Sequence, residues 1–275
     1  MEQKVLNLCV VVVIYNKSFF NSKTLQSLLY QKYVKDYLYI TLNIYDNSVD
    51  AKIKTNDIIA LNENFSKVNY NHDGFNHPLS VIYEREFKKD GGDYVLLLDD
   101  DTTLPGNYFE AFFLQYKKYG DGVVFVPRIT INGKLFSPYH SWLFISKPIN
   151  SNHQGQSHGI SAINSGVYIP KTKKIESFKY PEYTTFYGTD TVLFEYINRE
   201  NICIVTMGIS VSHDLTFHPS SEIDKYMLSL SKVVCFWKAH YKKNIFSYIM
   251  LFFYLLFLTV KLSLKTRKFI NLFNM

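Results

Sequence analysis

The order of apolar and polar stretches along the chain predicts an α/β fold with a mostly parallel sheet. Short apolar runs that are typical of buried strands alternate with stretches whose apolar residues recur at helical spacing. The strands are expected at residues 5–15, 39–45, 57–61, 94–98, 122–127, 160–169 and 203–211. The helices are expected at residues 23–31, 78–87, 108–116 and 190–199. Residues 128–160, rich in His, Ser, Asn and aromatic side chains, are expected to form loops or short strands.

Polar side chains follow three of these strands, at the point where each strand ends. These groups are Tyr15-Asn16, Asp46-Asn47 and Asp99-Asp100-Asp101. Because right-handed crossovers bring the carboxyl ends of parallel strands to one edge of the sheet, we expect the three groups to lie close together. Ligands of open α/β sheets bind at such an edge, so the sequence predicts a binding site there.

The acidic run is the most informative of the three groups. Asp99, Asp100 and Asp101 come directly after the apolar run Val95–Leu98, which predicts a buried strand. Burying this much negative charge without a counter-charge is costly. Mg²⁺ and Mn²⁺ prefer oxygen ligands and often bridge to substrate phosphates. We therefore expect a metal–diphosphate site at the end of this strand, with a solvated acidic turn as the alternative.

Composition narrows the class of protein. With 275 residues, of which 47% are hydrophobic, the chain is expected to form one large domain or two small ones. Cys9, Cys203 and Cys235 are odd in number and far apart, which predicts buried free thiols in a reducing compartment rather than a disulfide framework. The first apolar stretch contains Asn7 and no small-residue cleavage site follows it, so we expect a strand and not a signal peptide.

The C-terminal part combines a long apolar stretch with basic residues. Residues 245–260 contain no charge, and lysines flank them on both sides. Sixteen residues fall short of the roughly 20 that a transmembrane helix needs, so we expect a helix in the membrane interface or dipping into one leaflet. A full span is the first alternative, and a core helix of the soluble domain the second. From Lys232 onward eight basic and no acidic residues occur, which favours an anionic membrane surface over nucleic acid.

Five ordered motifs resemble the family-2 glycosyltransferases with the GT-A fold, over roughly residues 8–215. They are Val11–Asn16, an opening strand with a Tyr-Asn pair; Tyr45–Ser48, similar to an Asp-Asn-x-Ser turn; Leu98–Asp101, a D-x-D motif; Ser165-Gly166 followed by Gly188-Thr189-Asp190; and His213. Within the family, the bacterial polysaccharide enzymes, including rhamnosyltransferase-like ones, look nearest. The resemblance implies a Rossmann-like, mostly parallel mixed sheet, followed here by a hydrophobic and basic helical tail.

The resemblance also implies a role for each motif residue. The residues expected to contact the nucleotide-diphosphate sugar are Tyr15, Asn16, Asp46, Asp99 and Asp100. The residues expected to hold Mn²⁺ or Mg²⁺, which neutralises the departing nucleoside diphosphate, are Asp99, Asp101 and His213. Asp190 is the expected general base, which takes a proton from an acceptor hydroxyl.

Three of these residues also have a simpler structural explanation. Asp46 could be only an Asx-turn residue, Asp190 only a helix N-cap, and His213 only a structural histidine. Thr189 occupies the position where the family often has a second acid, so no second candidate for the general base lies next to Asp190. The histidines of the middle region, which are not at metal-binding spacing and are expected to be loop residues that touch the acceptor, are His140, His153 and His158.

Together these features predict an inverting, metal-dependent glycosyltransferase that acts in cell-surface polysaccharide synthesis. It is expected to transfer a single hexose or deoxyhexose, because the Q-x-x-R-W motif of processive members is absent. The expected acceptor is a hydroxyl of a lipid-linked oligosaccharide, because the apolar, basic tail would hold the site near such a substrate. Residues 1–220 would form the transferase domain, with a nucleotide-sugar half (1–127) and an acceptor half (128–220). Residues 221–275 would associate, peripherally or by shallow insertion, with the cytoplasmic face of the inner membrane.

Two other functions fit the central residues. The spacing Asp99-x-Asp101-x-Thr103 also matches haloacid-dehalogenase-type phosphatases, in which Asp99 would attack phosphate covalently. Such motifs usually lie on the first strand of the domain, whereas this one follows several predicted strands and helices. The other alternative is a non-catalytic nucleotide-sugar-binding membrane protein.

Overall fold

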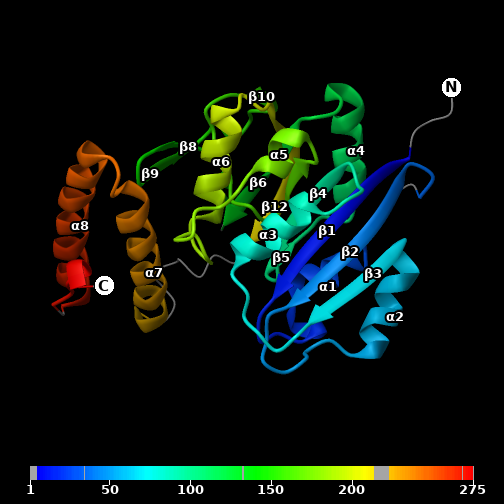
Figure 1. Cartoon of the computed structure of the whole chain (residues 1–275), viewed down its shortest axis with the longest axis horizontal. Helices are drawn as coiled ribbons and strands as arrows, with labels where there is room; N and C mark the ends of the chain where they lie inside the picture. Colours follow the sequence, from blue (N-terminus) through cyan, green and yellow to red (C-terminus); the bar gives the residue numbers. More distant parts are fainter. Residues whose placement is uncertain (1–4, 34, 132, 214–222, 268, 275) are drawn as a thin grey trace.

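A mixed sheet of ten strands forms the centre of the molecule (Figure 1). The computed structural model describes residues 5–33, 35–131, 133–213, 223–267 and 269–274. The strand order is β10-β12-β6-β11-β4-β1-β2-β3, with β5 beside β12 and β7 beside β6. The strands are β1 (Leu6–Ile14), β2 (Leu38–Asp46), β3 (Lys67–His72), β4 (Tyr94–Asp99), β5 (Thr102–Thr103), β6 (Val124–Ile131), β7 (Lys134–Ser137), β10 (Gly155–Ser157), β11 (Val167–Pro170) and β12 (Ile204–His213). A separate hairpin consists of β8 (Tyr139–Trp142) and β9 (Ile145–Pro148).

Helices cover both faces of the sheet, and each face has its own apolar core. The helices on one face are α1 (Lys23–Leu28), α2 (Thr55–Asn64) and α4 (Tyr108–Tyr119), with a short 3₁₀ turn at Phe19–Asn21. A second 3₁₀ turn, Leu272–Asn274, packs against the C-terminal helices. The helices on the other face are α3 (Leu79–Lys88), α5 (Lys173–Ser177) and α6 (Thr189–Arg199). Because β1 and β4 are buried on both sides, they are almost continuously apolar, as expected for central parallel strands.

Parallel pairing brings the predicted polar groups to one edge. In the register, Ile14 of β1 pairs with Asp46 of β2, and Val13 pairs with Asp99 of β4. The backbone N–H of Asn47 donates to the carbonyl of Ile14 at 2.9 Å. The predicted convergence of the three strand ends is therefore confirmed, together with the mixed α/β sheet.

The strand predicted at residues 57–61 was wrong, and the strand predicted at residues 160–169 was too long. Residues 57–61 lie inside helix α2, where the Asp57 carboxylate accepts a hydrogen bond from the Lys54 backbone N–H at 2.9 Å and caps the first turn. The actual third strand is β3, a half-polar edge strand that apolar alternation does not mark. The sheet strand there is β11, Val167–Pro170, which starts late because Gly166 (φ 91°) turns the chain before it.

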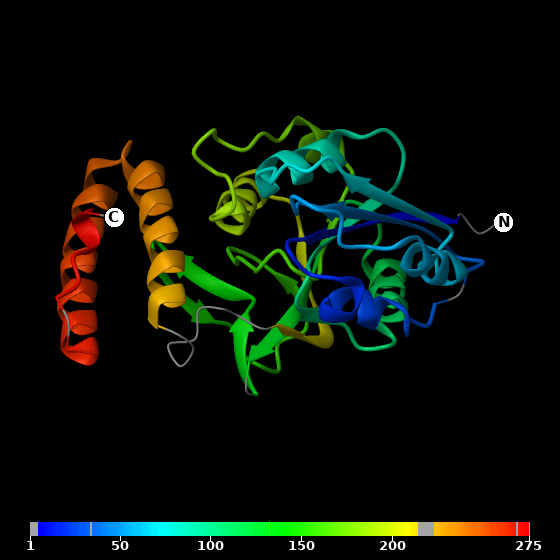
Figure 2. The same ribbon diagram turned by 90° about the horizontal axis from the view of Figure 1, so that it is seen from below.

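The chain ends in a helical hairpin beside the sheet domain. It consists of α7 (Ile223–Tyr241) and α8 (Ile245–Thr266), which pack against each other through leucine and aromatic side chains (Figure 2). The predicted charge-free helix is confirmed and runs on to Thr266. By length and composition α8 could cross a membrane, and only 22% of its most apolar window is buried. The turn expected at residues 214–221, and the helix cap at Ser220 or Ser221, lie outside the described residues.

The cysteines agree in part with the sequence prediction. Cys9, Cys203 and Cys235 are all free, so the described chain contains no disulfide between them. Cys9 and Cys203 are half-buried, but Cys235 on α7 is exposed. The expectation that all three are buried was wrong for Cys235, because it lies on a face of α7 that neither α8 nor the sheet domain covers.

Candidate functional site

A short antiparallel pairing joins His213 to the acidic run. Strand β5 follows Asp101 directly and pairs with the end of β12, so that His213 lies opposite Thr102. The ligand atoms of Asp99, Asp101 and His213 all lie within 4.8 Å of one another. The Nδ1 atom of His213 is 3.1 Å from Oδ1 of Asp101. The structure thus brings together the three residues expected to hold a metal.

This cluster has the chemistry of a divalent-cation site. Oδ1 of Asp101 is buried and accepts no hydrogen bond from any described residue. Burial raises the pKa of Asp99 to about 6, with the charges of Asp101 and Asp100 adding to the effect and His213 opposing it. Burial also raises the pKa of Asp101. Two half-buried carboxylates and an imidazole close together form a donor set that Mn²⁺ or Mg²⁺ accepts.

Hydroxyl groups behind the cluster hold its backbone and the His213 ring. The Ser165 Oγ accepts a hydrogen bond from the Asp99 N–H at 2.9 Å and lies 2.5 Å from the Thr102 hydroxyl. The Thr102 hydroxyl in turn lies 2.9 Å from His213 Nδ1. Thr24 bonds to the carbonyls of Asp99 and Thr102. Thr102 and Thr24 were missed by the sequence analysis, because neither belongs to a recognisable spacing.

A pocket of about 300 Å³ opens at the ends of the parallel strands, and we call it the strand-edge pocket. It is lined by Val13, Tyr15, Asn47, Asn76, Leu79, Asp99, Asp100, Phe186, Tyr187 and Lys232. Two of the expected residues are tied together here, since the Tyr15 N–H donates to Asp100 at 3.3 Å. Asp100 also forms an ion pair with Lys17 at 2.6 Å. This ion pair was missed, although Lys17 follows the Tyr-Asn motif directly.

Asn16 and Asp46 hold the turns beside this pocket. Asn16 has a left-handed backbone (φ 53°), and its N–H donates to Ser48 Oγ at 2.8 Å. Asp46 is 2% exposed and accepts hydrogen bonds from the Ser48 N–H (3.0 Å), the Lys52 N–H (2.7 Å) and the Tyr70 hydroxyl (2.6 Å). Burial raises the pKa of Asp46, but these hydrogen bonds outweigh burial and leave it lowered. Asp46 therefore forms an Asx turn, and its contact with the donor stays a prediction.

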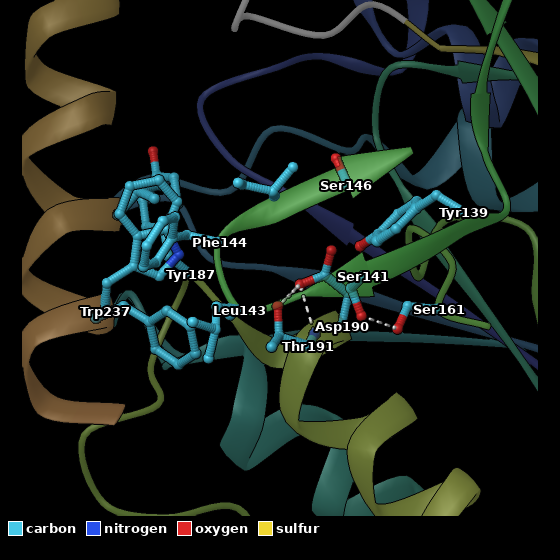
Figure 3. A pocket seen from close by; sticks show the side chains of 14 residues that line it. Tyr139, Ser141, Leu143, Phe144, Ser146, Ser161, Tyr187, Asp190, Thr191 and Trp237 are labelled. Atoms are coloured by element: carbon cyan, nitrogen blue, oxygen red, sulfur yellow. Dashed lines mark hydrogen bonds between the residues drawn. The ribbon is translucent and has the colours of Figure 1, made fainter. Parts of the chain in front are cut away.

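A second pocket, of about 350 Å³, contains Asp190, and we call it the Asp190 pocket. Figure 3 shows the Asp190 carboxylate directed into it from the start of α6, between Thr191 and the β8–β9 hairpin. Oδ1 of Asp190 accepts a hydrogen bond from the Thr191 N–H at 2.8 Å. Burial raises the pKa of Asp190. Gly188, with φ 78°, is the N-cap of α6, so the explanation of Asp190 as the cap was wrong.

The two pockets share a wall, and the middle histidines lie elsewhere. Tyr187 lines both pockets, and helix α7 contributes Lys232 to one and Val233, Phe236 and Trp237 to the other. The sequence analysis missed this part of the site, because the C-terminal region was assigned to the membrane. The residues of a separate cavity of about 490 Å³ include His140, His153, His158 and Lys147.

Comparisons with known proteins agree with this architecture. The family model described as Glycosyl transferase family 2 matches residues 9–200. The chain is similar in structure to GalNAc-T7, solved with UDP, GalNAc and Mn²⁺ (TM-score 0.55, 15% identity, 83% of this chain and 48% of that one). It is also similar to residues 1–349 of S. aureus TarS (TM-score 0.53, 13% identity, 87% of this chain and 73% of that one). The structure of the same TarS residues in complex with UDP is similar as well (TM-score 0.52, 13% identity, 84% of this chain and 65% of that one).

The chain spans about half the length of the GalNAc-T7 structure. No curated protein sequence matches the chain. The family match covers well over half of the 275 residues, and the structural neighbours, at 13–15% identity, share the fold. The chain therefore belongs to glycosyltransferase family 2 and has the GT-A fold.

Proposed function

We propose that this protein transfers a single hexose or deoxyhexose from a nucleotide-diphosphate sugar to a hydroxyl of a lipid-linked oligosaccharide, with inversion. The observation that carries the proposal is the pair of adjoining pockets. One pocket has the acidic edge of β4, the other contains the buried Asp190, and Tyr187 lines both. A donor and an acceptor bound in these pockets would meet at their common wall.

The residues divide the chemistry between them. Tyr15, Asn16, Asp46, Asp99 and Asp100 form or support the donor side. Asp99, Asp101 and His213 would hold Mn²⁺ or Mg²⁺, which when bound neutralises charge on the leaving nucleoside diphosphate. Asp190 takes the proton from the acceptor hydroxyl, whose oxygen bonds to the anomeric carbon as the bond from that carbon to the diphosphate breaks. Attack from the face opposite the diphosphate inverts the configuration.

The solved relatives support the donor class. GalNAc-T7 was solved with UDP and Mn²⁺, and TarS with UDP. We therefore infer a nucleoside diphosphate as the leaving group and a divalent cation as its partner. The phosphatase alternative loses support, because the acidic run lies on β4 within a family-2 sheet rather than on a first strand. A non-catalytic protein would keep nucleotide binding without turnover.

The outer face of α8 supports a membrane partner. Side chains on this face are apolar and open, including Ile249, Phe252, Phe253, Phe257 and Val260, each 47–58% exposed. The opposite face packs on α7, so α8 has no polar face as a helix of a soluble protein would. Basic residues at both ends of α8 would meet anionic headgroups.

We therefore assign residues 1–220 to the transferase domain, with its nucleotide half (1–127) and acceptor half (128–220), and residues 221–275 to a membrane-associating tail. The tail would lie on the cytoplasmic face of the inner membrane, peripherally or shallowly inserted, where nucleotide sugars are available. An acceptor held by a lipid anchor would reach the Asp190 pocket from that surface, as in cell-surface polysaccharide synthesis.

Thermal unfolding with nucleotides tests the donor site. We expect one of UDP, dTDP, GDP and CMP to raise the unfolding midpoint in the presence of Mn²⁺, because a ligand that binds only the folded state stabilises it by mass action. The variant Asp101→Asn should lose the Mn²⁺-dependent part of the shift. Stabilisation by none of the four nucleotides would refute the donor site. Binding without release of nucleoside diphosphate from any sugar donor would instead support the non-catalytic alternative.

Vesicle flotation tests the membrane partner separately. The full chain should float with anionic vesicles, and Phe253→Glu on the open face of α8 should reduce flotation several-fold. Phe20→Glu is the matched control, because Phe20 is 77% exposed on the sheet domain and far in sequence from the tail. Equal flotation of both variants would exclude the α8 face as the contact.

A further inference from the structure

The C-terminal hairpin reaches the strand-edge pocket, and this contact carries an inference beyond a membrane anchor. We propose that Lys232 of helix α7 binds the diphosphate of the donor, so that α7 is a wall of the active site. The inference rests on the proposed function, since it takes the strand-edge pocket as the donor site. It adds a phosphate-binding residue and a second role for the tail.

The position of Lys232 is the first support. Lys232 lines the strand-edge pocket together with Tyr15, Asp99 and Asp100. Its ammonium lies 5.9 Å from the centroid of the Tyr187 ring, so an aromatic face holds the charge at the boundary of the two pockets. A diphosphate bound near Asp99 and a divalent cation keeps negative charge in excess, and a lysine ammonium is a suitable point-charge partner for it.

The close packing of α7 is the second support. Phe236, one helical turn after Lys232, is 5% exposed and belongs to the core that α6 builds on the sheet. A Cβ atom on Gly188 would lie 2.2 Å from the Phe236 ring, so only glycine admits this approach. Gly188 is the N-cap of α6, two residues before Asp190. The contact therefore sets α7 against the same turn that presents Asp190.

Further contacts fix the C-terminal end of α7 and the pocket hairpin. His240 lies between two partners of the sheet domain, with its Nδ1 3.1 Å from the Tyr183 hydroxyl and its Nε2 3.0 Å from Glu195. Phe144, at the tip of the β8–β9 hairpin, stacks on Tyr254 of α8 at 4.2 Å between ring centroids. Figure 3 shows Trp237 and Phe144 on the α7 side of the Asp190 pocket. The tail is thus joined to both pockets rather than attached only by the chain.

Binding of nucleoside diphosphates and nucleosides to the full-length protein in mild detergent tests this role. For each of UDP, dTDP and GDP, the affinity in Mn²⁺ is compared with that of the matching nucleoside by titration calorimetry. We expect Lys232→Met to weaken the diphosphate by about 10-fold, as for loss of one charge-assisted contact, and the nucleoside by less than about 2-fold. Lys232→Arg should keep most of the affinity, because it keeps the charge.

The control is Lys243→Met, which removes an exposed lysine from the turn between α7 and α8. It should leave both affinities unchanged. If the wild type binds a nucleoside diphosphate and Lys232→Met binds it as tightly, the assignment of Lys232 is wrong while the donor site stands. If Lys232→Met weakens nucleoside and diphosphate equally, Lys232 has no phosphate-specific role. If the wild type binds none of the three diphosphates, the proposed function fails and the inference with it.

Discussion

In the strand-edge pocket most polar side chains stand at the ends of parallel strands, whereas in the Asp190 pocket they come from a helix start, a hairpin and the C-terminal helix α7. Asp46 and Asp100 at the strand edge are also held differently from Asp190, whereas burial raises the pKa of Asp99 at the same edge as it does that of Asp190. Asp46 and Asp100, on the strand side, accept several hydrogen bonds or an ion pair. Asp190 accepts hydrogen bonds only from its neighbour Thr191 among the described residues, in a partly apolar pocket. We expect the hydrogen bonds of Asp46 and the ion pair of Asp100 to stabilise the fold, and the buried, ionised Asp190 to lower its stability.

The largest expected effect is at Asp190. We expect Asp190→Asn to lower kcat about 1,000-fold, because removal of a general base costs about 10² to 10⁴ in rate. The same variant should unfold at a higher temperature at pH 7. Burial raises the pKa of Asp190 above its ordinary value of 3.8, so ionised Asp190 costs stability once the pH passes that value. We expect a gain of about 2 °C, a typical scale for a chain of this size.

Turnover and calorimetric midpoints at pH 7 check this prediction together. Glu176→Gln on helix α5 is the control, because Glu176 is exposed and lines neither pocket. A stabilised variant with wild-type turnover would show that Asp190 is not the base. A variant that loses both turnover and stability would contradict the expectation that the buried, ionised Asp190 lowers the stability of the fold.

The next effect in size is at the metal cluster. We expect Asp101→Asn to weaken Mn²⁺ binding by more than about 100-fold, since loss of a ligand costs more than loss of an outer partner. Without Mn²⁺ the folded protein should be as stable as the wild type or more so, because burial raises the pKa of Asp101. Mn²⁺ titration followed by paramagnetic broadening measures the affinity. Asp50→Asn, at a side chain that is 87% exposed, should change nothing, and equal loss in both variants would contradict a specific site.

The contrast between the pockets also explains what the sequence could predict. Strands β1, β2 and β4 are apolar runs with a polar residue at the end, and parallel pairing brings those ends together by a general rule. This made Tyr15, Asp46 and the acidic run predictable as one edge. Helix α2 was misread because its apolar residues are too few to distinguish a helix from a short strand.

Long-range contacts were not predictable in the same way. Strand β5, which pairs with β12, consists of two residues, and two residues are too few to show a strand periodicity in the sequence. The motif resemblance suggested His213, but only that pairing explains why Thr102 touches it. The packing of α7 on Gly188 depends on a glycine in the left-handed region and on the shape of Phe236, and neither appears in a pattern of apolar residues.

Thr102 allows a test of such a hidden contact, with a smaller expected effect. We expect Thr102→Val, which keeps the shape of the side chain, to weaken Mn²⁺ binding by about 10-fold, because the hydroxyl next to His213 Nδ1 orients the ring. Thr103→Val is the matched control, since Thr103 is the neighbour in β5 and is exposed while Thr102 is buried. If both variants bind Mn²⁺ equally, the hydroxyl does not orient His213.

The last expected effect concerns stability alone: a pH dependence at Asp46, with the opposite sign to that at Asp190. Hydrogen bonds outweigh burial and hold the pKa of Asp46 below its ordinary value of 3.8. A lowered pKa contributes stability that is fully present above 3.8 and is lost as the pH falls through the folded-state value. Asp46→Asn should therefore be less stable than the wild type at pH 7, by about 1–3 kcal/mol, because an amide NH₂ would face the Lys52 N–H donor.

Urea unfolding of the wild type and Asp46→Asn between pH 7 and pH 3 measures the difference directly. The gap between the two proteins should be constant down to about pH 5 and should narrow below 3.8, when protonation removes the advantage of the carboxylate. Asp190→Asn should be more stable than the wild type at pH 7. This difference in stability should also become smaller as the pH falls, because protonation removes the cost of the buried charge. If both variants were less stable than the wild type at pH 7, Asp46 and Asp190 would be held in the same way, and the distinction between a hydrogen-bonded acid at the strand edge and a desolvated acid at the helix start would have to be abandoned.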